Sequence, residues 1–172
     1  MKRIEVRLSL PVVAPLLDLI KATSDILEAH IAAPLTLEDI DADFRAEWKA
    51  ELLEGQKAEL HSLLALFDTD FFINGVVSFD QANAEAVVRA CSALRLRLRR
   101  YELKPISDEV LESGSVDAES IALPMQKPYM AYVFLGTIQE LIIQHLDSEI
   151  LGETGLDSGD YGPDEDESGG KR

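Results

Sequence analysis

The most apolar stretch of this chain is PYMAYVFLGTIQELIIQHL, residues 128–146. A helix that is apolar on most sides is usually buried on most sides. We therefore predict a central C-terminal helix here, with Pro128 in its first turn, where the missing N–H of proline costs little. The apolar side chains fall on two neighbouring helical stripes, which are Met130, Val133, Phe134, Thr137 and Leu141, and Leu135, Ile138, Ile142 and Leu146.

The length of this stretch would also suit a membrane span, but its polar residues argue against one. Gln139, Glu140, Gln144 and His145 lie inside the run. A carboxylate is costly in the hydrocarbon core of a bilayer, and the segment that follows is acidic, with no basic flank. We therefore expect no membrane partner.

Composition limits the classes of function. The chain has 172 residues, a hydrophobic content of 47% and a formal net charge of −16. This length and this apolar content predict one domain with a core, and the acidity disfavours nucleic acid as a partner, so protein partners are expected. The single cysteine excludes an intrachain disulfide and suits a reducing compartment. The first residues lack the apolar segment of a signal peptide, and we predict a cytoplasmic protein.

Residues 3–8 alternate charged and apolar side chains, which predicts a short, half-buried strand. Ser9 and Pro11 then mark the start of a helix. Pro15 removes one backbone hydrogen bond, so we expect irregular first turns. The helix should end before Pro34.

A second helical pattern covers residues 37–67. Thr36 and Asp39 resemble a capping box at its start. Phe44, Trp48 and Leu52 fall in its apolar stripe, and Gly55 interrupts it. One helix kinked near the glycine and two separate helices fit this pattern equally well.

Residues 71–79, FFINGVVSF, are rich in aromatic and β-branched side chains around an Asn-Gly pair. Asn-Gly favours a hairpin turn, but each arm would have only about three residues and would need support. We slightly prefer a loop followed by one strand, Val76 to Phe79, which pairs with residues 3–8.

The next helix begins at a cap formed by Ser78 or Asp80 and ends at Lys104 and Pro105. Its core positions are spaced alternately by three and four residues, which predicts a helical seam. These positions are Ala84, Val87, Cys91, Leu94, Leu98 and Tyr101.

Together these patterns predict a mostly α fold, with four to five helices packed around the central C-terminal helix and a small β element at residues 3–8 and about 76–79. A short helix is expected at residues 107–113. Residues 1–151 should form a single helical domain. Residues 152–172 are rich in Gly, Asp and Glu, and this composition predicts a disordered acidic tail, because it buries too little apolar surface to offset chain entropy.

Three pieces of the chain, residues 42–67, 77–98 and 132–146, together resemble the AosR-like family, a bacterial domain of unknown function. The resemblance covers about residues 3–148. Its most specific part is the pattern Leu135-Gly136-x-Ile138-Gln139-Glu140-Leu141, preceded by Tyr132. The family name implies an oxidation-sensing transcriptional regulator. Such sensing relies on redox cysteines, and Cys91 is the single cysteine of this chain.

The basic residues of the chain concentrate in the predicted helix that ends at Lys104 and Pro105. A functional interpretation is an anion or nucleic-acid patch. The alternative, which we favour in a chain of net charge −16, is pairing with the acidic second helix or the tail. The residues are Arg89, Arg95, Arg97, Arg99, Arg100 and Lys104.

Catalytic motifs are not found in the sequence. It contains neither a Gly-rich phosphate loop nor a nucleophile elbow, and His30, His61 and His145 fall on separate helices without metal-ligand spacing. We therefore predict no catalytic, cofactor-binding or metal-binding residue. Cys91 lies on the core seam and is expected to pack as a small apolar side chain.

Gln139 and Glu140 are the candidate interaction residues of the central helix. A carboxylate in a buried helix must be paired, hydrogen-bonded or neutral, so we predict that Arg95 or Arg97 contacts Glu140. The equally weighted alternative is a Glu140 that reaches solvent at the helix edge. The resulting hypothesis is a non-enzymatic regulatory or protein-interaction domain, associated with transcription if the family resemblance holds. The alternative is an enzyme with a site of scattered carboxylates and histidines near Glu140.

Overall fold

The structure is a computed structural model that describes residues 2–33, 39–114 and 116–153, with only the backbone for residues 147–153. It is mostly helical with a small β element, as predicted. The long helices are α1 (Leu10–Leu27), α2 (Ala42–Leu64), α4 (Ala84–Tyr101) and α6 (Leu123–Glu153). The shorter elements are β1 (Arg3–Arg7), α3 (Thr69–Asn74), β2 (Val76–Asp80), α5 (Asp108–Ser113) and the 3₁₀ helix η1 (Ala118–Ser120).

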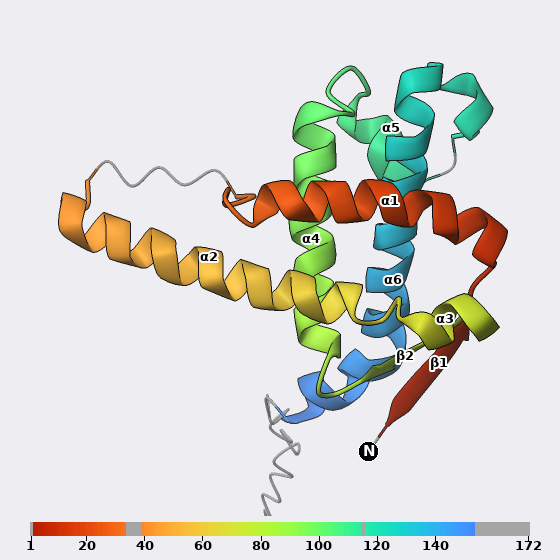
Figure 1. The fold of residues 1–172 in the computed structure, drawn as a ribbon, viewed down its shortest axis with the longest axis horizontal. Helices are drawn as coiled ribbons and strands as arrows, with labels where there is room; N and C mark the ends of the chain where they lie inside the picture. The colour runs from red at the N-terminus through yellow and green to blue at the C-terminus, as the bar shows by residue number, and fades with distance from the viewer. Residues whose placement is uncertain (1, 34–38, 115, 154–172) are drawn as a thin grey trace, which may run out of the picture.

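Helix α6 lies side by side with α4, and α1 crosses both of them (Figure 1). The inward side chains of α6, among them Leu135 and Ile138, are buried in the core. The predicted central helix is therefore present, but it begins at Leu123, so Pro128 lies inside the helix and not in its first turn. Pro124 is compatible with this earlier start, because it occupies the first turn, where no N–H is needed.

Helix α1 is continuous through Pro15, so the predicted irregular first turns are absent in this described helix. The backbone carbonyl of Ser9 accepts hydrogen bonds from Val12 and Val13, although the Ser9 side chain makes no capping bond. The helix ends at Leu27, earlier than the predicted stop before Pro34.

Buried Gln56 of α2 binds the segment in which α1 ends. Its Nε2 donates to the carbonyl oxygens of Leu27 at 2.7 Å and His30 at 2.9 Å. Its Oε1 accepts from the Ala32 N–H at 3.0 Å. Because the last carbonyls of a helix lack intrahelical partners, this one side chain stabilises the end of α1.

Helix α2 is one helix that passes through Gly55, which decides between the two alternatives for residues 37–67. Asp41 caps it, because the Asp41 carboxylate accepts from the Asp43 N–H at 3.1 Å. The predicted capping box is wrong as a helix start, since α2 begins at Ala42; Thr36 itself lies outside the described residues.

The Asn-Gly pair ends a helix and does not turn a hairpin. Gly75 caps α3 with a left-handed φ of 72°, and its N–H donates to Phe71 O at 2.7 Å. Glycine is required here, because a Cβ at this position would lie 2.8 Å from Leu8 O. The hairpin alternative is therefore wrong, and the preferred loop is instead the short helix α3.

Strands β1 and β2 pair antiparallel, which confirms the predicted pairing, with Val6 opposite Val77 and Ile4 opposite Phe79. The side chains of Val77 and Phe79 are buried, so this face of the sheet adds to the core. The other face carries the exposed side chains of β1, which are Arg3, Glu5 and Arg7.

The predicted seam of α4 is buried from Ala84 to Leu98, whereas Tyr101 at its end is 54% exposed. The N-cap position of α4 is Asn83, and not Ser78 or Asp80 as predicted. The short helix predicted at residues 107–113 is α5, and Ser107 caps it. The tail predicted from residue 152 starts too early, because α6 continues to Glu153; the rest of the predicted tail lies outside the described residues.

Candidate functional site

Gln139 is the centre of a polar cluster between α4 and α6. Its Oε1 accepts from Arg95 Nη1 at 2.9 Å, and its Nε2 donates to Ser92 Oγ at 2.7 Å and to Val88 O at 3.0 Å. Both ends of the amide are thus satisfied by groups on α4. Such a network fixes how one helix lies against the other, because any sliding would break several hydrogen bonds together.

Arg95 lies flat against α6. Its guanidinium carbon is 4.2 Å from the ring centroid of Tyr132, within the range of a cation–π contact. A Cβ added at Gly136 would be 3.1 Å from the same carbon, so the missing side chain of Gly136 makes room for the guanidinium. Tyr132, Gly136 and Gln139, all named in the family pattern, therefore surround one arginine.

The predicted contact from Arg95 or Arg97 to Glu140 is wrong. Among the described residues Glu140 forms no ion pair; it is exposed and accepts from Gln144 Nε2 at 3.0 Å. Each residue of a helix is turned by about 100° from the one before, so when Gln139 faces α4 its neighbour faces solvent. The alternative of a Glu140 at the helix edge is confirmed.

The other arginines of α4 are distributed among separate partners. Arg89 pairs with Glu59 of α2 at 3.6 Å and with Glu85 at 2.6 Å. Arg99 pairs with Asp108 at 2.5 Å, and this hydrogen bond raises the pKa of the guanidinium further. These two arginines are thus neutralised by carboxylates of their own chain.

Arg97 and Arg100 both lie near the ring of Tyr101, with guanidinium carbons 3.5 Å and 5.8 Å from its centroid. Arg100 is exposed, whereas Arg97 is half-buried. The stacking explains why Tyr101 leaves the core seam, since its ring covers the Arg97 side chain at the surface.

Cys91 is fully buried on the α4 seam. Burial raises the pKa of its thiol from 9.0 to about 12, and the nearby positive charge of Arg95 only partly opposes this effect. A thiol with this pKa is protonated at neutral pH, and oxidation proceeds through the thiolate. The expectation of a buried, apolar cysteine is confirmed.

A cavity of about 350 Å³ opens beside Arg95 and Glu140. Three residues with a hydroxyl group line it, which are Ser113, Tyr132 and Thr137. Two of these hydroxyls are engaged with backbone, because Ser113 Oγ donates to Val110 O and Thr137 Oγ1 donates to Val133 O. No histidine lines this cavity, and the carboxylates that line it are those of Glu112 and Glu140. In the part of the chain that the structure describes, no cluster of His, Cys, Asp and Glu is placed to hold a metal ion.

Helix α2 carries an exposed apolar surface that was not predicted from the sequence. Phe44 is 61% exposed, and Trp48 and Leu52 are each 37% exposed, although their spacing had placed them in an apolar stripe. Residues at positions i, i+4 and i+8 share one side of a helix. The N-terminal half of α2 extends well past α4, away from the rest of the fold (Figure 1). We call Phe44, Trp48, Leu52 and Gly55 the α2 face.

The α2 face continues into a groove of about 460 Å³ between α2 and α4. Gly55 lies in this groove, and a Cβ added there would meet nothing within 4 Å. Leu96 of α4 forms part of the opposite wall, and Glu51 and Glu59 lie at the α2 side. The groove is thus a mainly apolar hollow with Glu51 at its α2 side, where Glu59 is already paired with Arg89. Its remaining lining residues are Ile31, Ala32, Ala33, Leu52, Gln56, Arg89, Ser92 and Ala93.

Comparison of the chain with family models, with curated proteins and with solved structures finds no match. The resemblance to the AosR-like family therefore stays a prediction from the three pieces of sequence that carry it. Within the described ranges, none of the helices combines the length and the apolar character that a membrane crossing needs.

Proposed function

We propose that this protein is a non-enzymatic interaction domain, and that its α2 face binds an amphipathic helix of a partner protein. The observation that carries the proposal is the exposed apolar row Phe44, Trp48 and Leu52, which leads directly into the groove between α2 and α4. An amphipathic helix in an apolar groove is a recurrent form of protein recognition, in which side chains spaced by three or four residues anchor the helix.

The charges beside the α2 face favour a partner helix with basic residues. Glu47 and Glu51 lie along one flank of the apolar row, and Arg45 and Lys49 lie along the other, as the helical rotation of 100° per residue requires. The whole chain has a net charge of −16, which attracts a basic partner at long range. Glu47 and Glu51 would then hold the basic flank of the bound helix.

Gly55 supports the same proposal. A glycine in the middle of a helix costs about 1 kcal/mol relative to alanine, and here no contact within 4 Å inside the protein requires it. Its position in the groove would let a partner backbone approach α2 closely. A regulatory role, associated with transcription if the family resemblance holds, would act through this binding in the cytoplasm.

The enzyme alternative near Glu140 has weaker support. Glu140 is exposed and bonded to Gln144, and His145 on the same helix is also exposed. The polar cluster of Arg95 and Gln139 is accounted for by its role in holding α4 against α6.

Photocrosslinking in cells tests the proposal. A benzoylphenylalanine at Leu52, in the groove, is compared with one at Ile143, an exposed position on α6. We expect crosslinks from position 52 that map to an amphipathic, basic helix of the partner and that disappear with the additional substitution Gly55→Phe. Equal crosslinking from position 143, or crosslinks at position 52 that survive Gly55→Phe, would contradict the proposal.

A further inference from the structure

Strand β1 has an unpaired edge. The Leu8 N–H donates to Gly75 O at 2.7 Å. In an antiparallel pair the backbone N–H and C=O groups of successive residues alternate in direction. The backbone groups of Val6 therefore point toward β2, whereas those of Arg3, Glu5 and Arg7 point away from it. In residues 2–33, 39–114 and 116–153, these three outward residues have no hydrogen-bond partner for their backbone groups. Their side chains are exposed.

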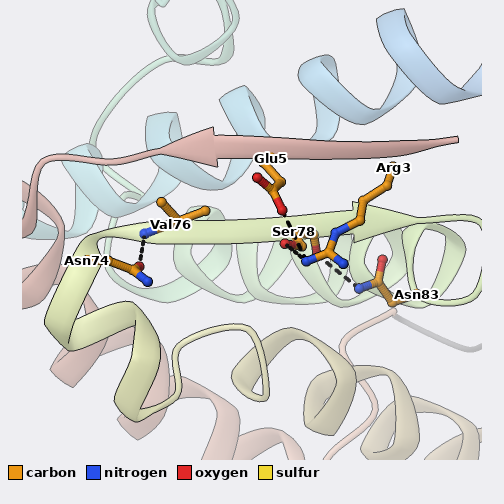
Figure 2. Close-up of polar contacts among 6 residues, drawn as sticks. All are labelled: Arg3, Glu5, Asn74, Val76, Ser78 and Asn83. Carbon is orange, nitrogen blue, oxygen red and sulfur yellow. Dashed lines mark hydrogen bonds and ion pairs between the residues drawn. The ribbon is translucent and has the colours of Figure 1, made fainter.

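The outer edge of β2, by contrast, is closed by side chains. Asn74 Oδ1 accepts from the Val76 N–H at 2.8 Å, and Asn83 Nδ2 donates to Ser78 O at 3.1 Å (Figure 2). Asn83 Oδ1 also accepts from the Asp80 N–H at 3.0 Å. Proteins commonly block exposed strand edges against unwanted pairing. Here one edge is blocked and the other is open.

We propose that β1 pairs with β1 of a second copy of this chain, antiparallel and centred on Val6, to form the sheet β2-β1-β1-β2. Glu5 then lies opposite Arg7 of the second copy, and Arg7 lies opposite its Glu5. These residues carry the outward backbone groups, so each such pair exchanges two hydrogen bonds. A two-fold axis at Val6 makes the contact isologous and limits it to a dimer.

Side chains select this register on both faces of the sheet. When the strand pairing is centred on Val6, the inner face of the sheet places Val6 opposite Val6 of the second copy and Ile4 opposite its Leu8. These are apolar pairs that continue the core face. Centred on Glu5, the two Glu5 carboxylates would lie opposite each other and Arg3 would oppose Arg7, which repels. Centred on Ile4, the apolar Val6 would oppose Lys2. Only the Val6 register pairs opposite charges and apolar side chains together.

Exposed apolar surface continues beyond the end of β1. Ile73 is 75% exposed and Phe72 is 53% exposed, and both lie within three residues of Gly75, whose carbonyl binds Leu8. A five-residue strand pair buries little surface alone, so adjacent apolar side chains would be needed in a stable interface. Val12 of α1, four positions after Leu8 in the sequence, is a further exposed apolar side chain.

A crosslinking experiment tests the register. In the Val6 register the two Val6 residues form a non-hydrogen-bonded pair on the two-fold axis, with Cα atoms about 4.5 Å apart, close enough for a disulfide. We expect Val6→Cys to form a disulfide-linked dimer under mild oxidation. Ile4→Cys, which would oppose Leu8, is the matched control and should not. The buried native Cys91 does not compete. Failure of Val6→Cys to crosslink, or equal crosslinking of both variants, would overturn this register.

Sedimentation of the full chain with a C-terminal tag tests the dimer itself. We expect wild type to dimerise with concentration, Glu5→Arg and Arg7→Glu each to be monomeric, and a mixture of the two variants to dimerise again. Both positions are exposed, so circular dichroism should report an unchanged fold. A wild type that stays monomeric, or single variants that dimerise as wild type does, would overturn the proposal. Gly55→Phe should still dimerise, which separates this inference from the helix-binding function.

Discussion

The guanidinium of Arg95 occupies the space that a side chain at position 136 would fill: a Cβ on Gly136 would lie 3.1 Å from Arg95 Cζ and 3.2 Å from its Nη2. The arginine has little freedom to move aside, because Tyr132 covers its face and Gln139 accepts from its Nη1. A glycine in mid-helix lowers helix stability, and here Gly136 allows α4 and α6 to make a close contact.

The first prediction concerns this contact. Gly136→Ala should lower the free energy of unfolding by about 1 kcal/mol, because displacement of Arg95 outweighs the gain in helix propensity. In an Arg95→Ala background the same change should raise it by about 1 kcal/mol, since only the propensity remains. Urea unfolding of the four proteins in the cycle measures both values. The same sign in both backgrounds would show that the arginine does not decide the effect.

Substitutions of two neighbouring residues on α6, Gln139 and Glu140, should differ sharply in their effect on stability. Gln139→Ala removes an acceptor from Arg95 and a donor to Val88 O and Ser92 Oγ, so we expect a loss of about 1–3 kcal/mol. Glu140→Ala should change stability by less than about 0.5 kcal/mol, because its carboxylate is exposed. Thermal and urea unfolding of the two variants give the comparison. A larger loss for Glu140→Ala would restore the rejected Arg95–Glu140 contact.

A third prediction concerns α2. Gly55→Ala should raise the free energy of unfolding by about 0.5–1 kcal/mol, because alanine favours helix and the added Cβ enters open space. Loss of stability would mean that the glycine is required inside the fold. If Gly55→Ala raises stability and also weakens crosslinking of a partner at position 52, the two results together would indicate that the glycine is kept for binding.

Cys91 gives a prediction for alkaline pH. Folding raises the pKa of its thiol from 9.0 to about 12, so its contribution to stability is complete below pH 9 and is lost as pH rises toward 12. The difference in unfolding free energy between wild type and Cys91→Ala should therefore shrink by up to about 1.4 kcal/mol per pH unit in this window. Other titrating groups are common to both proteins and cancel. A constant difference across the window would contradict the burial of the thiol.

Much of the fold follows from local patterns in the sequence. The seam of α4 and the pairing of β1 with β2 were predicted because period and alternation report which residues share a face. Helix α3 was missed because Phe71, Phe72 and Ile73 resemble a strand. The capping bond from the Phe71 N–H to Asp68 at 2.9 Å and the Gly75 stop make this segment helical.

The candidate site was predicted only in part, for a related reason. Arg95 and Arg97 were the two arginines predicted to meet α6. Arg95 does so, but its partner is Gln139 and not Glu140, a difference of one helical step that depends on how α6 is rotated. Similarly, the period of α2 groups Phe44 with Trp48 and Leu52 but does not report what covers them. That depends on how far α2 extends beyond α4, which is a property of the tertiary fold (Figure 1).

The central claim is that the α2 face binds an amphipathic helix. Trp48 is the single tryptophan of the chain and lies on this face, so its emission reports binding there directly. The ligands are an amphipathic Leu/Lys peptide of about 18 residues and a scrambled peptide of the same composition, which controls for charge. The proteins are wild type and Gly55→Phe, with Glu140→Ala as an unrelated surface control.

We predict that the amphipathic peptide shifts the Trp48 emission to shorter wavelength in a saturable way and that the scrambled peptide does not. The substitution Gly55→Phe should weaken binding of the amphipathic peptide by at least about tenfold, or 1.4 kcal/mol, whereas Glu140→Ala should leave it unchanged. Equal effects of the two peptides, or full binding by Gly55→Phe, would contradict the account.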